Sequence, residues 1–259
     1  MNIDKMKNNY HTHTFRCKHA GGTEAEYIEK AISGGIEILG FSDHAPMPFP
    51  KDYDPPTRMD FDQIENYVTT ILKLKKEYEK DIEIHLGLEV EYYPAYWEQF
   101  LRLIEPYPIE YMILGQHFLG NEIGQLWCGK PMDSPEHLKQ YVRQTIEGLD
   151  QYQFLYLAHP DLIHFTGDPE LYRDWMRVLV KECTKRSVLL EINLLGLRTN
   201  RNYPNPVFWE IAGQENAKVV IGIDAHQVEQ MDYQESERMA KELVDRFQLN
   251  LVEDALPLN

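Results

Sequence analysis

Short apolar runs alternate with longer amphipathic stretches along almost the whole chain. A short, continuous apolar run is typical of a parallel strand that is buried on both faces. Most of these runs end on a histidine or an acidic residue. We therefore predict seven strands, of which the first ends at His13 and the others cover residues 36–42, 82–90, 111–117, 154–158, 188–193 and 217–223.

The amphipathic stretches between these runs predict helices, and several carry start and stop signals. Thr23 and Glu26 form a T-x-x-E capping box, and the Gly-Gly pair at 34–35 provides a stop. Ser134 followed by Pro135 is a frequent beginning of a helix. We predict helices over residues 23–34, 61–80, 97–104, 169–186, 206–212 and 234–247, one more that starts at Pro135, and a Pro-rich loop over 46–56.

The repeated order of strand and helix favours parallel strands joined by helices. Seven such units predict an α/β fold, a distorted (β/α)7 barrel of the TIM-like type, in which closure gives every strand edge a partner. An open, doubly wound sheet is the alternative. A chain of 259 residues with 43% hydrophobic residues can bury one large core, so we predict a single domain over residues 1–259.

Reactive side chains gather where the predicted strands end. In a parallel barrel all carboxyl ends lie on one rim, and active sites form there. Taken singly, each histidine could be an ordinary structural residue, as we expect for His85 and His137. Seven of the ten histidines nevertheless fall at or next to strand ends, and this coincidence favours a common site. The candidate metal ligands are His11, His13, His19, His44, Glu89, His117, His159, Asp224 and His226.

Composition narrows the classes of partner. The formal net charge of −16 argues against nucleic acid or an anionic membrane as the main partner. No apolar run has the length of a membrane span, and residues 1–10 lack the apolar core of a signal peptide. Three widely spaced cysteines favour a reduced, cytoplasmic setting. Cys17 lies between two candidate ligands; we expect a bystander thiol, with a metal contact as the alternative.

Seven imidazoles and two carboxylates exceed the needs of one tetrahedral zinc ion. They suit two or three divalent ions that share a bridging carboxylate. Such clusters activate water near neutral pH and stabilise the attacking and leaving oxygens of an in-line displacement at phosphorus. Mixed nitrogen and oxygen ligands suit zinc, manganese or iron, and the spacing does not choose among them.

A phosphoryl substrate also needs fixed cationic donors. Arg198 and Arg201 follow the sixth predicted strand, where a guanidinium can clamp a phosphate by two hydrogen bonds. A solvated surface arginine is the alternative at each position. Arg58, in the Pro-rich loop, is a weaker candidate. His164, five residues after His159, is a candidate for a contact with the substrate or for support of a ligand.

The motifs together resemble those of the PHP (polymerase and histidinol phosphatase) superfamily over nearly the whole chain. They are His11-Thr12-His13, Ser42-Asp43-His44, Gly87-Leu88-Glu89, Gln116-His117, Ala158-His159-Pro160 and Asp224-Ala225-His226. The resemblance implies a distorted (β/α)7 barrel with three metal ions. One ion would be held by His11, His13, Glu89 and Asp224, a second by Glu89, His117 and His159, and a third by His19, His44 and His226.

Softer features resemble the histidinol-phosphatase branch of that superfamily. They are the chain length, Asp43-His44-Ala45-Pro46, Glu89-Val90-Glu91-Tyr92, Asn193 to Arg198, and Tyr203-Pro204; His164 stands where the resemblance leads us to expect Arg or Lys. The implied activity is metal-dependent hydrolysis of L-histidinol phosphate, a small-molecule phosphate ester, in histidine synthesis. Arg198 would then bear phosphoryl charge, and Asp43 or a water would protonate the leaving group.

Two alternatives to this activity stay open. The same machinery could act on another phosphate ester, such as a phosphotyrosyl peptide, a nucleotide or an oligonucleotide end. The chain could instead be a non-catalytic metal-binding barrel, although a scaffold has no need of nine ligand positions.

Overall fold

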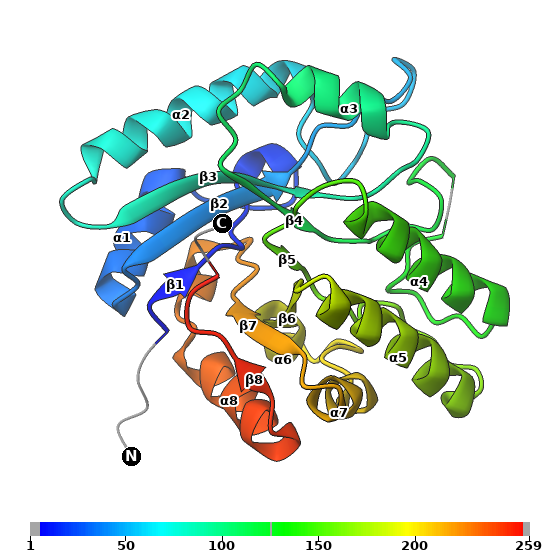
Figure 1. The fold of residues 1–259 in the computed structure, drawn as a ribbon. Helices are drawn as coiled ribbons and strands as arrows, with labels where there is room; N and C mark the ends of the chain where they lie inside the picture. The colour runs from blue at the N-terminus through cyan, green and yellow to red at the C-terminus, as the bar shows by residue number, and fades with distance from the viewer. Residues whose placement is uncertain (1–5, 125, 256–259) are drawn as a thin grey trace.

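The computed structural model describes residues 6–124 and 126–255 as eight parallel strands with helices around them (Figure 1). The strands follow one another in the sheet in chain order, and the sheet curls into a TIM-like barrel. The predicted fold class is therefore confirmed, while the single domain over 1–259 stays a prediction. The strands are β1 (Asn8–Asn9), β2 (Ile38–His44), β3 (Glu83–Val90), β4 (Tyr111–Leu114), β5 (Tyr156–Leu157), β6 (Leu189–Asn193), β7 (Lys218–Gly222) and β8 (Asn250–Leu251).

The barrel closes at the carboxyl ends of its strands. Just past β1, Thr12 forms a parallel bridge with Ala225, which follows β7. The amide of His13 donates to the carbonyl of Ala225 at 2.9 Å. At the other end of β7, the strand β8 pairs in parallel with Lys218 and Val219. This eighth strand was not predicted, because two residues are too few for a readable apolar run.

The helices lie outside the sheet and match the predicted ones closely (Figure 1). Thr23 forms the predicted capping box with Glu26. Ser134 precedes its helix but makes no side-chain capping bond. The helices are α1 (Glu24–Gly34), α2 (Ile64–Glu77), α3 (Trp97–Ile104), α4 (Pro135–Leu149), α5 (Pro169–Lys185), α6 (Leu194–Arg198), α7 (Pro206–Gln214) and α8 (Gln234–Phe247).

Two differences from the predicted helices are a later start of α2 and one additional helix, α6. The turn over Phe61–Gln63 is a 3-10 helix, so α2 begins three residues later than its apolar stripe suggests. The short helix α6 follows β6 without a loop, because the Asn193 side chain accepts a hydrogen bond from the amide of Gly196 and caps it. A five-residue helix offers too little periodicity for prediction from sequence.

The barrel interior below the strand ends is filled by apolar and aromatic side chains. This inner cluster is separate from the larger core between sheet and helices, and it contains Tyr10, Tyr111, Ile113, Leu155, Tyr156, Ala158, Leu189 and Val220. The barrel is therefore packed, and a cavity can form only at an end.

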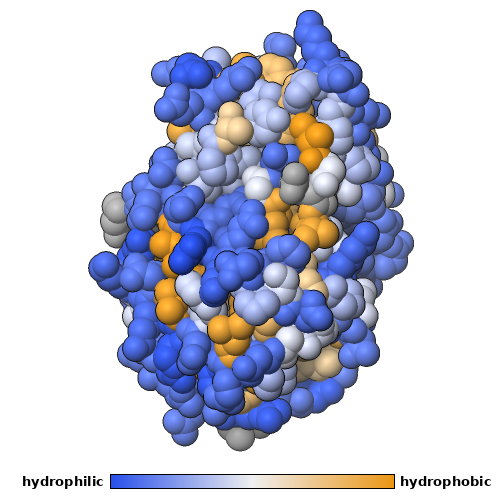
Figure 2. Space-filling view, turned by 90° about the vertical axis from the view of Figure 1, so that its right-hand side faces the viewer, coloured by the Kyte–Doolittle hydropathy of each residue, from blue (hydrophilic) through white to orange (hydrophobic). Residues whose placement is uncertain are grey.

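The right-hand side of Figure 1, toward which β2 and β3 run, faces the viewer in Figure 2. This face is mainly hydrophilic and carries several separate hydrophobic patches. Among the described residues, no helix has the length and apolar character needed to cross a membrane.

Candidate metal centre

The predicted ligands come together at the carboxyl ends of the strands, here called the rim. His44 is the last residue of β2, Glu89 is the second-last residue of β3, and Asp224 lies two residues after β7. A cavity of about 480 Å3 opens at the rim. Its lining includes His19, His44, Glu89, Glu91, His117, Asp224 and His226, with Thr57, Phe118, Trp127, Leu195, Thr199, Arg201, Tyr203, Gln227 and Gln230.

Glu89 is the centre of this arrangement. Its side chain is 1% exposed, and both carboxylate oxygens face imidazole nitrogens. A glycine at 115 makes room for it, since a Cβ there would lie 2.0 Å from Glu89 Oε1. Oε2 lies 3.4 Å from His11 Nε2, 3.4 Å from His13 Nε2 and 3.1 Å from His44 Nδ1; Oε1 lies 2.9 Å from His159 Nε2 and 3.6 Å from His117 Nε2.

Asp224 forms a second acidic point across the cavity. Its Oδ1 lies 3.5 Å from His11 Nε2, 3.2 Å from His13 Nε2 and 3.3 Å from His226 Nδ1. The rings of His13 and His226 stack with their centroids 3.9 Å apart. Asp224 therefore contacts His11 and His13 on one side and His226 on the other.

Several sets of ligand atoms lie within 4.8 Å of one another, a separation that one cation can bridge. These sets overlap with those that the family resemblance implied, and their role as ligands is a proposal taken up below. They include His11, His13 and Glu89; His11, His159 and Asp224; His19, His44 and His226; His44, Glu91 and His117; and His13, Cys17 and His226.

A test of fit comes from the buried polar atoms. Among the described residues, His11 Nε2, both ring nitrogens of His13, His44 Nδ1 and Glu89 Oε2 have no hydrogen-bond partner. Leaving such a buried atom unsatisfied costs about 1–3 kcal/mol. Except for His13 Nδ1, which faces Asp43, these atoms converge on one place, and bound cations would satisfy them. The residues therefore fit a cluster of divalent ions.

Three of the candidate ligand histidines have a carboxylate behind the ring, and we call them the carboxylate-backed group: His11, His13 and His117. Glu191 Oε1 lies 2.7 Å from His11 Nδ1, and Glu91 Oε1 lies 2.9 Å from His117 Nδ1. Asp43 Oδ1 lies 3.5 Å from His13 Nδ1. Such partners fix the tautomer and raise the basicity of a metal-binding imidazole.

The outer group consists of His19, His44 and His226, and among the described residues none of these rings has a carboxylate of its own behind it. His19 Nδ1 lies 2.7 Å from the carbonyl oxygen of Cys17. His44 faces Glu89, and His226 faces Asp224. Each of these carboxylates also contacts other imidazoles.

The pKa values follow this division. Burial lowers the pKa of His11, but Glu191, Asp224 and Glu89 outweigh it and hold the pKa well above the ordinary value. Burial is likewise outweighed by Asp224, Asp43 and Glu89 at His13, whose pKa rises from 6.5 to about 9. The pKa of His117 is also raised, by Glu89 and Glu91 against burial.

In the outer group, burial decides the direction. It lowers the pKa of His44 and His226 to well below the ordinary value, and neighbouring imidazoles add to the effect. The pKa of His19 is lowered for the same reason. For the two central acids burial acts in the opposite direction, but the surrounding imidazoles outweigh it and hold the pKa of Glu89 and Asp224 well below their usual range.

Glu191 and Glu91 were not predicted as site residues. Glu191 accepts from the His159 amide at 2.9 Å and from Asn193 Nδ2 at 3.0 Å. Because it also lies behind His11, it supports two candidate ligands, His11 and His159. Its signal was its place inside β6, where it faces the barrel interior like Glu89 inside β3. The prediction weighed mainly the residues at strand ends and so overlooked it.

Asp43 does not fit the predicted role of proton donor. Its side chain is fully buried behind His13, and it is absent from the cavity lining given above. Oδ2 accepts from the hydroxyl of Thr14, while Oδ1 accepts from the His44 amide at 2.9 Å. A carboxylate held in this way supports the residues around it.

Arg198 also differs from the prediction. Its guanidinium donates to the carbonyl oxygens of Ile223, at 3.0 Å, and Gln230, at 3.2 Å, so it holds the end of β7 and is not among the cavity-lining residues. Arg201 does line the cavity, where it donates to the hydroxyl of Tyr203 at 2.9 Å. His164 is not among the cavity-lining residues either, and its backbone pairs with Cys128 and Met132.

Cys17 is fully buried, and burial together with Asp43 raises the pKa of its thiol. A neutral thiol agrees with the bystander role that we expect, although Cys17 lies within 4.8 Å of the ligand atoms of His13 and His226.

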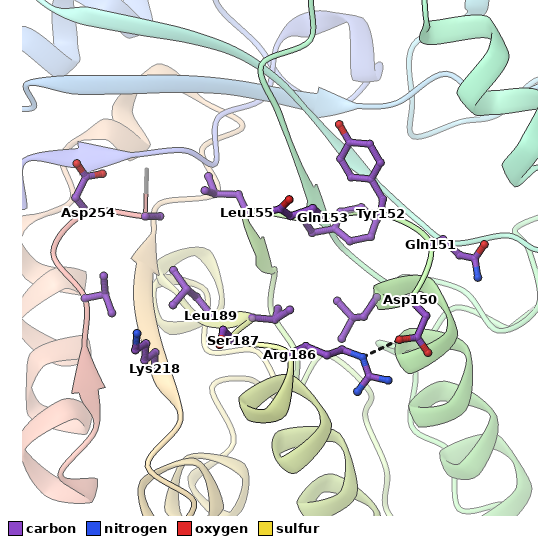
Figure 3. Close-up of a pocket in the computed structure, with 15 residues that line it drawn as sticks. Asp150, Gln151, Tyr152, Gln153, Leu155, Arg186, Ser187, Leu189, Lys218 and Asp254 are labelled. Carbon is purple, nitrogen blue, oxygen red and sulfur yellow. Dashed lines mark hydrogen bonds and ion pairs between the residues drawn. The ribbon is translucent and has the colours of Figure 1, made fainter. Parts of the chain in front are cut away.

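A second cavity of about 720 Å3 lies at the opposite end of the barrel (Figure 3). Residues 149–155, 186–189 and 218 line it, next to the starts of β5, β6 and β7. Two of the lining residues form an ion pair, in which Arg186 Nε donates to Asp150 Oδ1 at 2.8 Å. None of the predicted site residues lines this cavity, so the candidate chemistry is confined to the rim.

The fold and the rim together define a class: a TIM-like barrel with a candidate metal site built from histidines and carboxylates. The PHP domain family matches residues 9–194, and the chain belongs to this family. It is 29% identical over 235 residues to a probable histidinol-phosphatase of Deinococcus radiodurans, covering 84% of this chain and 85% of that protein. It is 29% identical over 266 residues to the histidinol-phosphatase of Bacillus subtilis, covering 88% and 96%.

The chain is also similar in fold to a solved structure. This is the histidinol phosphate phosphatase from Lactococcus lactis, complexed with zinc, L-histidinol and phosphate. The TM-score is 0.74 and the identity 17%, with 96% of each chain covered.

Proposed function

We propose that the chain is a histidinol-phosphatase, a metal-dependent phosphomonoesterase that hydrolyses L-histidinol phosphate to L-histidinol and phosphate in histidine biosynthesis. The observation that carries this proposal is the meeting of nine His, Glu and Asp side chains at one rim, in a chain whose relatives from D. radiodurans and B. subtilis are named probable histidinol-phosphatase and histidinol-phosphatase. The solved structure with zinc, L-histidinol and phosphate supports a small-molecule phosphate ester as substrate.

Three divalent ions, of zinc, manganese or iron, are the proposed cofactors. His11, His13, Glu89 and Asp224 would hold the first, Glu89, His117 and His159 the second, and His19, His44 and His226 the third. When bound, such ions lower the pKa of water and neutralise phosphoryl oxygens. Glu89 and Asp224 supply the anionic charge that keeps several cations close together.

The chain's own residues orient the ligands and the substrate. Glu191, Glu91 and Asp43 hold the imidazoles of the carboxylate-backed group so that their other nitrogens face inward. Arg201 is the cavity-lining arginine, so we assign it the phosphate contact first expected of Arg198. Phe118 and Trp127, which form an antiparallel bridge, give the cavity an aromatic wall for the organic part of the ester.

A phosphate-release assay tests this proposal. Histidinol phosphate should be hydrolysed far faster than phosphotyrosine, phosphoserine or a nucleoside monophosphate. Activity should disappear after dialysis against a chelator and return with zinc or manganese. Similar rates on all esters would overturn the assignment of the substrate but not the metal-dependent chemistry. Full activity in metal-free protein would overturn both.

A further inference from the structure

Arg58 is a fully buried arginine that the proposed chemistry does not use. It lies in the loop between β2 and α2, and its side chain is 1% exposed. A buried guanidinium is costly unless its donors are all paired in good geometry. Its partners therefore indicate what it does.

The first partner is Glu91, just past the end of β3. The guanidinium lies 2.9 Å from each carboxylate oxygen of Glu91 and donates a hydrogen bond to Oε1. That same oxygen lies 2.9 Å from His117 Nδ1. Arg58 thus sets the orientation of the carboxylate that in turn orients the His117 ring.

The orientation of this ring matters because its other nitrogen faces the centre of the site. With Nδ1 held by Glu91, Nε2 of His117 points toward Glu89 Oε1, 3.6 Å away. A ring rotated about its Cβ–Cγ bond would not present Nε2 to the same place.

The remaining donors of Arg58 hold two further parts of the rim. One donates to the carbonyl oxygen of Ala45 at 2.9 Å, directly after the candidate ligand His44. Others donate to Glu122, whose Oε2 lies 2.7 Å from Arg58 Nε, in the loop after β4. The hydroxyl of Tyr53 donates to the same carboxylate at 3.2 Å. One side chain therefore joins the loops after β2 and β4 to Glu91, just past the end of β3.

We propose that Arg58 is a positioning residue for the metal centre, which through Glu91 fixes the imidazole of His117 and through Ala45 and Glu122 fixes the two rim loops on either side. This inference rests on the proposed role of His117 as a metal ligand. It goes beyond that role by naming the group that holds the ligand in place. A lysine cannot replace Arg58, because one ammonium cannot contact both oxygens of Glu91 while reaching Glu122.

The test compares Arg58→Lys, Glu91→Gln and His117→Gln with the wild-type chain. Each protein is loaded with zinc or manganese and dialysed against a graded series of chelator concentrations, and the metal retained per chain is measured by elemental analysis. Ile71→Val, on the buried face of α2, is the control for a general loss of stability. Circular dichroism of each variant shows whether the fold is retained.

We expect His117→Gln to identify the ion that depends on this ring. Arg58→Lys and Glu91→Gln should release the same ion at a chelator concentration about 10–100-fold lower than wild type, with the other ions unaffected. The double variant should lose little more than either single one, because both act through one contact. Ile71→Val should release its metal as the wild type does.

Distinct outcomes overturn the inference. Metal retention in Arg58→Lys equal to that of wild type or of Ile71→Val would show a purely structural ion pair. Loss of the ion in Glu91→Gln but not in Arg58→Lys would make Glu91 itself the ligand. If Arg58→Lys does not fold, Glu91→Gln alone decides, and normal retention there overturns the inference. A wild-type chain that holds no metal would instead overturn the proposed function.

Discussion

The two groups of rim histidines stand a few ångströms apart yet are supported in different ways. The carboxylate-backed group has Glu191, Asp43 and Glu91 behind its rings, and these acids lie inside the barrel or are paired with buried partners. The outer group shares the two central acids and otherwise faces a backbone carbonyl or the cavity. The pKa is raised throughout the first group and lowered throughout the second.

This contrast teaches that similar ligands need not give equivalent metal sites. A carboxylate behind an imidazole strengthens it as a ligand and fixes its ring, and its loss typically costs 10–100-fold in metal affinity. We therefore expect the ions held by the carboxylate-backed group to be retained, and the ion held by the outer group to exchange first.

Glu89→Gln should have the largest effect, because Glu89 contacts members of both groups. The change preserves volume and removes the central negative charge, so we expect metal to be lost from both groups. Phosphate release should fall by on the order of a thousandfold or more. Elemental analysis and kcat measured on the same sample test this. A Glu89→Gln chain with full metal content would show that the two groups are not joined through this residue.

His226→Gln should separate the two groups. It removes one ligand of the outer group, so the variant should retain the other ions while one ion is lost at a low chelator concentration. We expect phosphate release to fall about a hundredfold. His85→Gln is the matched control, since His85 sits at the opposite end of β3 between Glu83 and Glu110. Simultaneous loss of all ions from His226→Gln would contradict the division into groups.

Glu191→Gln tests the supporting acids. His11 keeps its ligand nitrogen, but the anion behind its ring becomes a neutral amide. Metal affinity at the carboxylate-backed group should fall about 10–100-fold, with release from the outer group unchanged. Glu210→Gln, which removes a surface ion pair with Arg173, provides the control. An unchanged chelator profile in Glu191→Gln would show that the acid contributes only to the fold.

How much of this could be read from the sequence depends on where each residue lies. The strand-end residues could be predicted from the sequence, because parallel strands carry their last side chains to one rim. Glu191 lies within a strand, so its place in an otherwise apolar run was a signal of burial, but the sequence did not name His11 as its partner. Arg198 was assigned to phosphate from its place after β6, but it folds back onto the carbonyl of Ile223. Contacts that depend on the path of a loop cannot be derived from spacing alone.

The smallest predicted effect concerns the stability of the metal-free chain as a function of pH. The folded pKa of His13 is raised from 6.5 to about 9, so its contribution to stability is fully present below about pH 6.5 and is lost as the pH rises through about 9. The folded pKa of His226 is lowered well below 6.5, so its contribution is present above about pH 6.5 and is lost as the pH falls. The two groups therefore act in opposite directions.

We expect the free energy of unfolding of the metal-free chain to be greatest near neutral pH and to fall on either side, by on the order of 1–3 kcal/mol. Urea unfolding between about pH 5.5 and 9 measures it. His13→Gln should flatten mainly the alkaline side, and His226→Gln mainly the acidic side. Zinc should remove the alkaline slope and steepen the acidic one, because bound metal keeps these nitrogens unprotonated in the folded chain while the unfolded chain still takes up protons. If both variants flatten the same side, the two groups do not differ in the way that their supporting acids indicate.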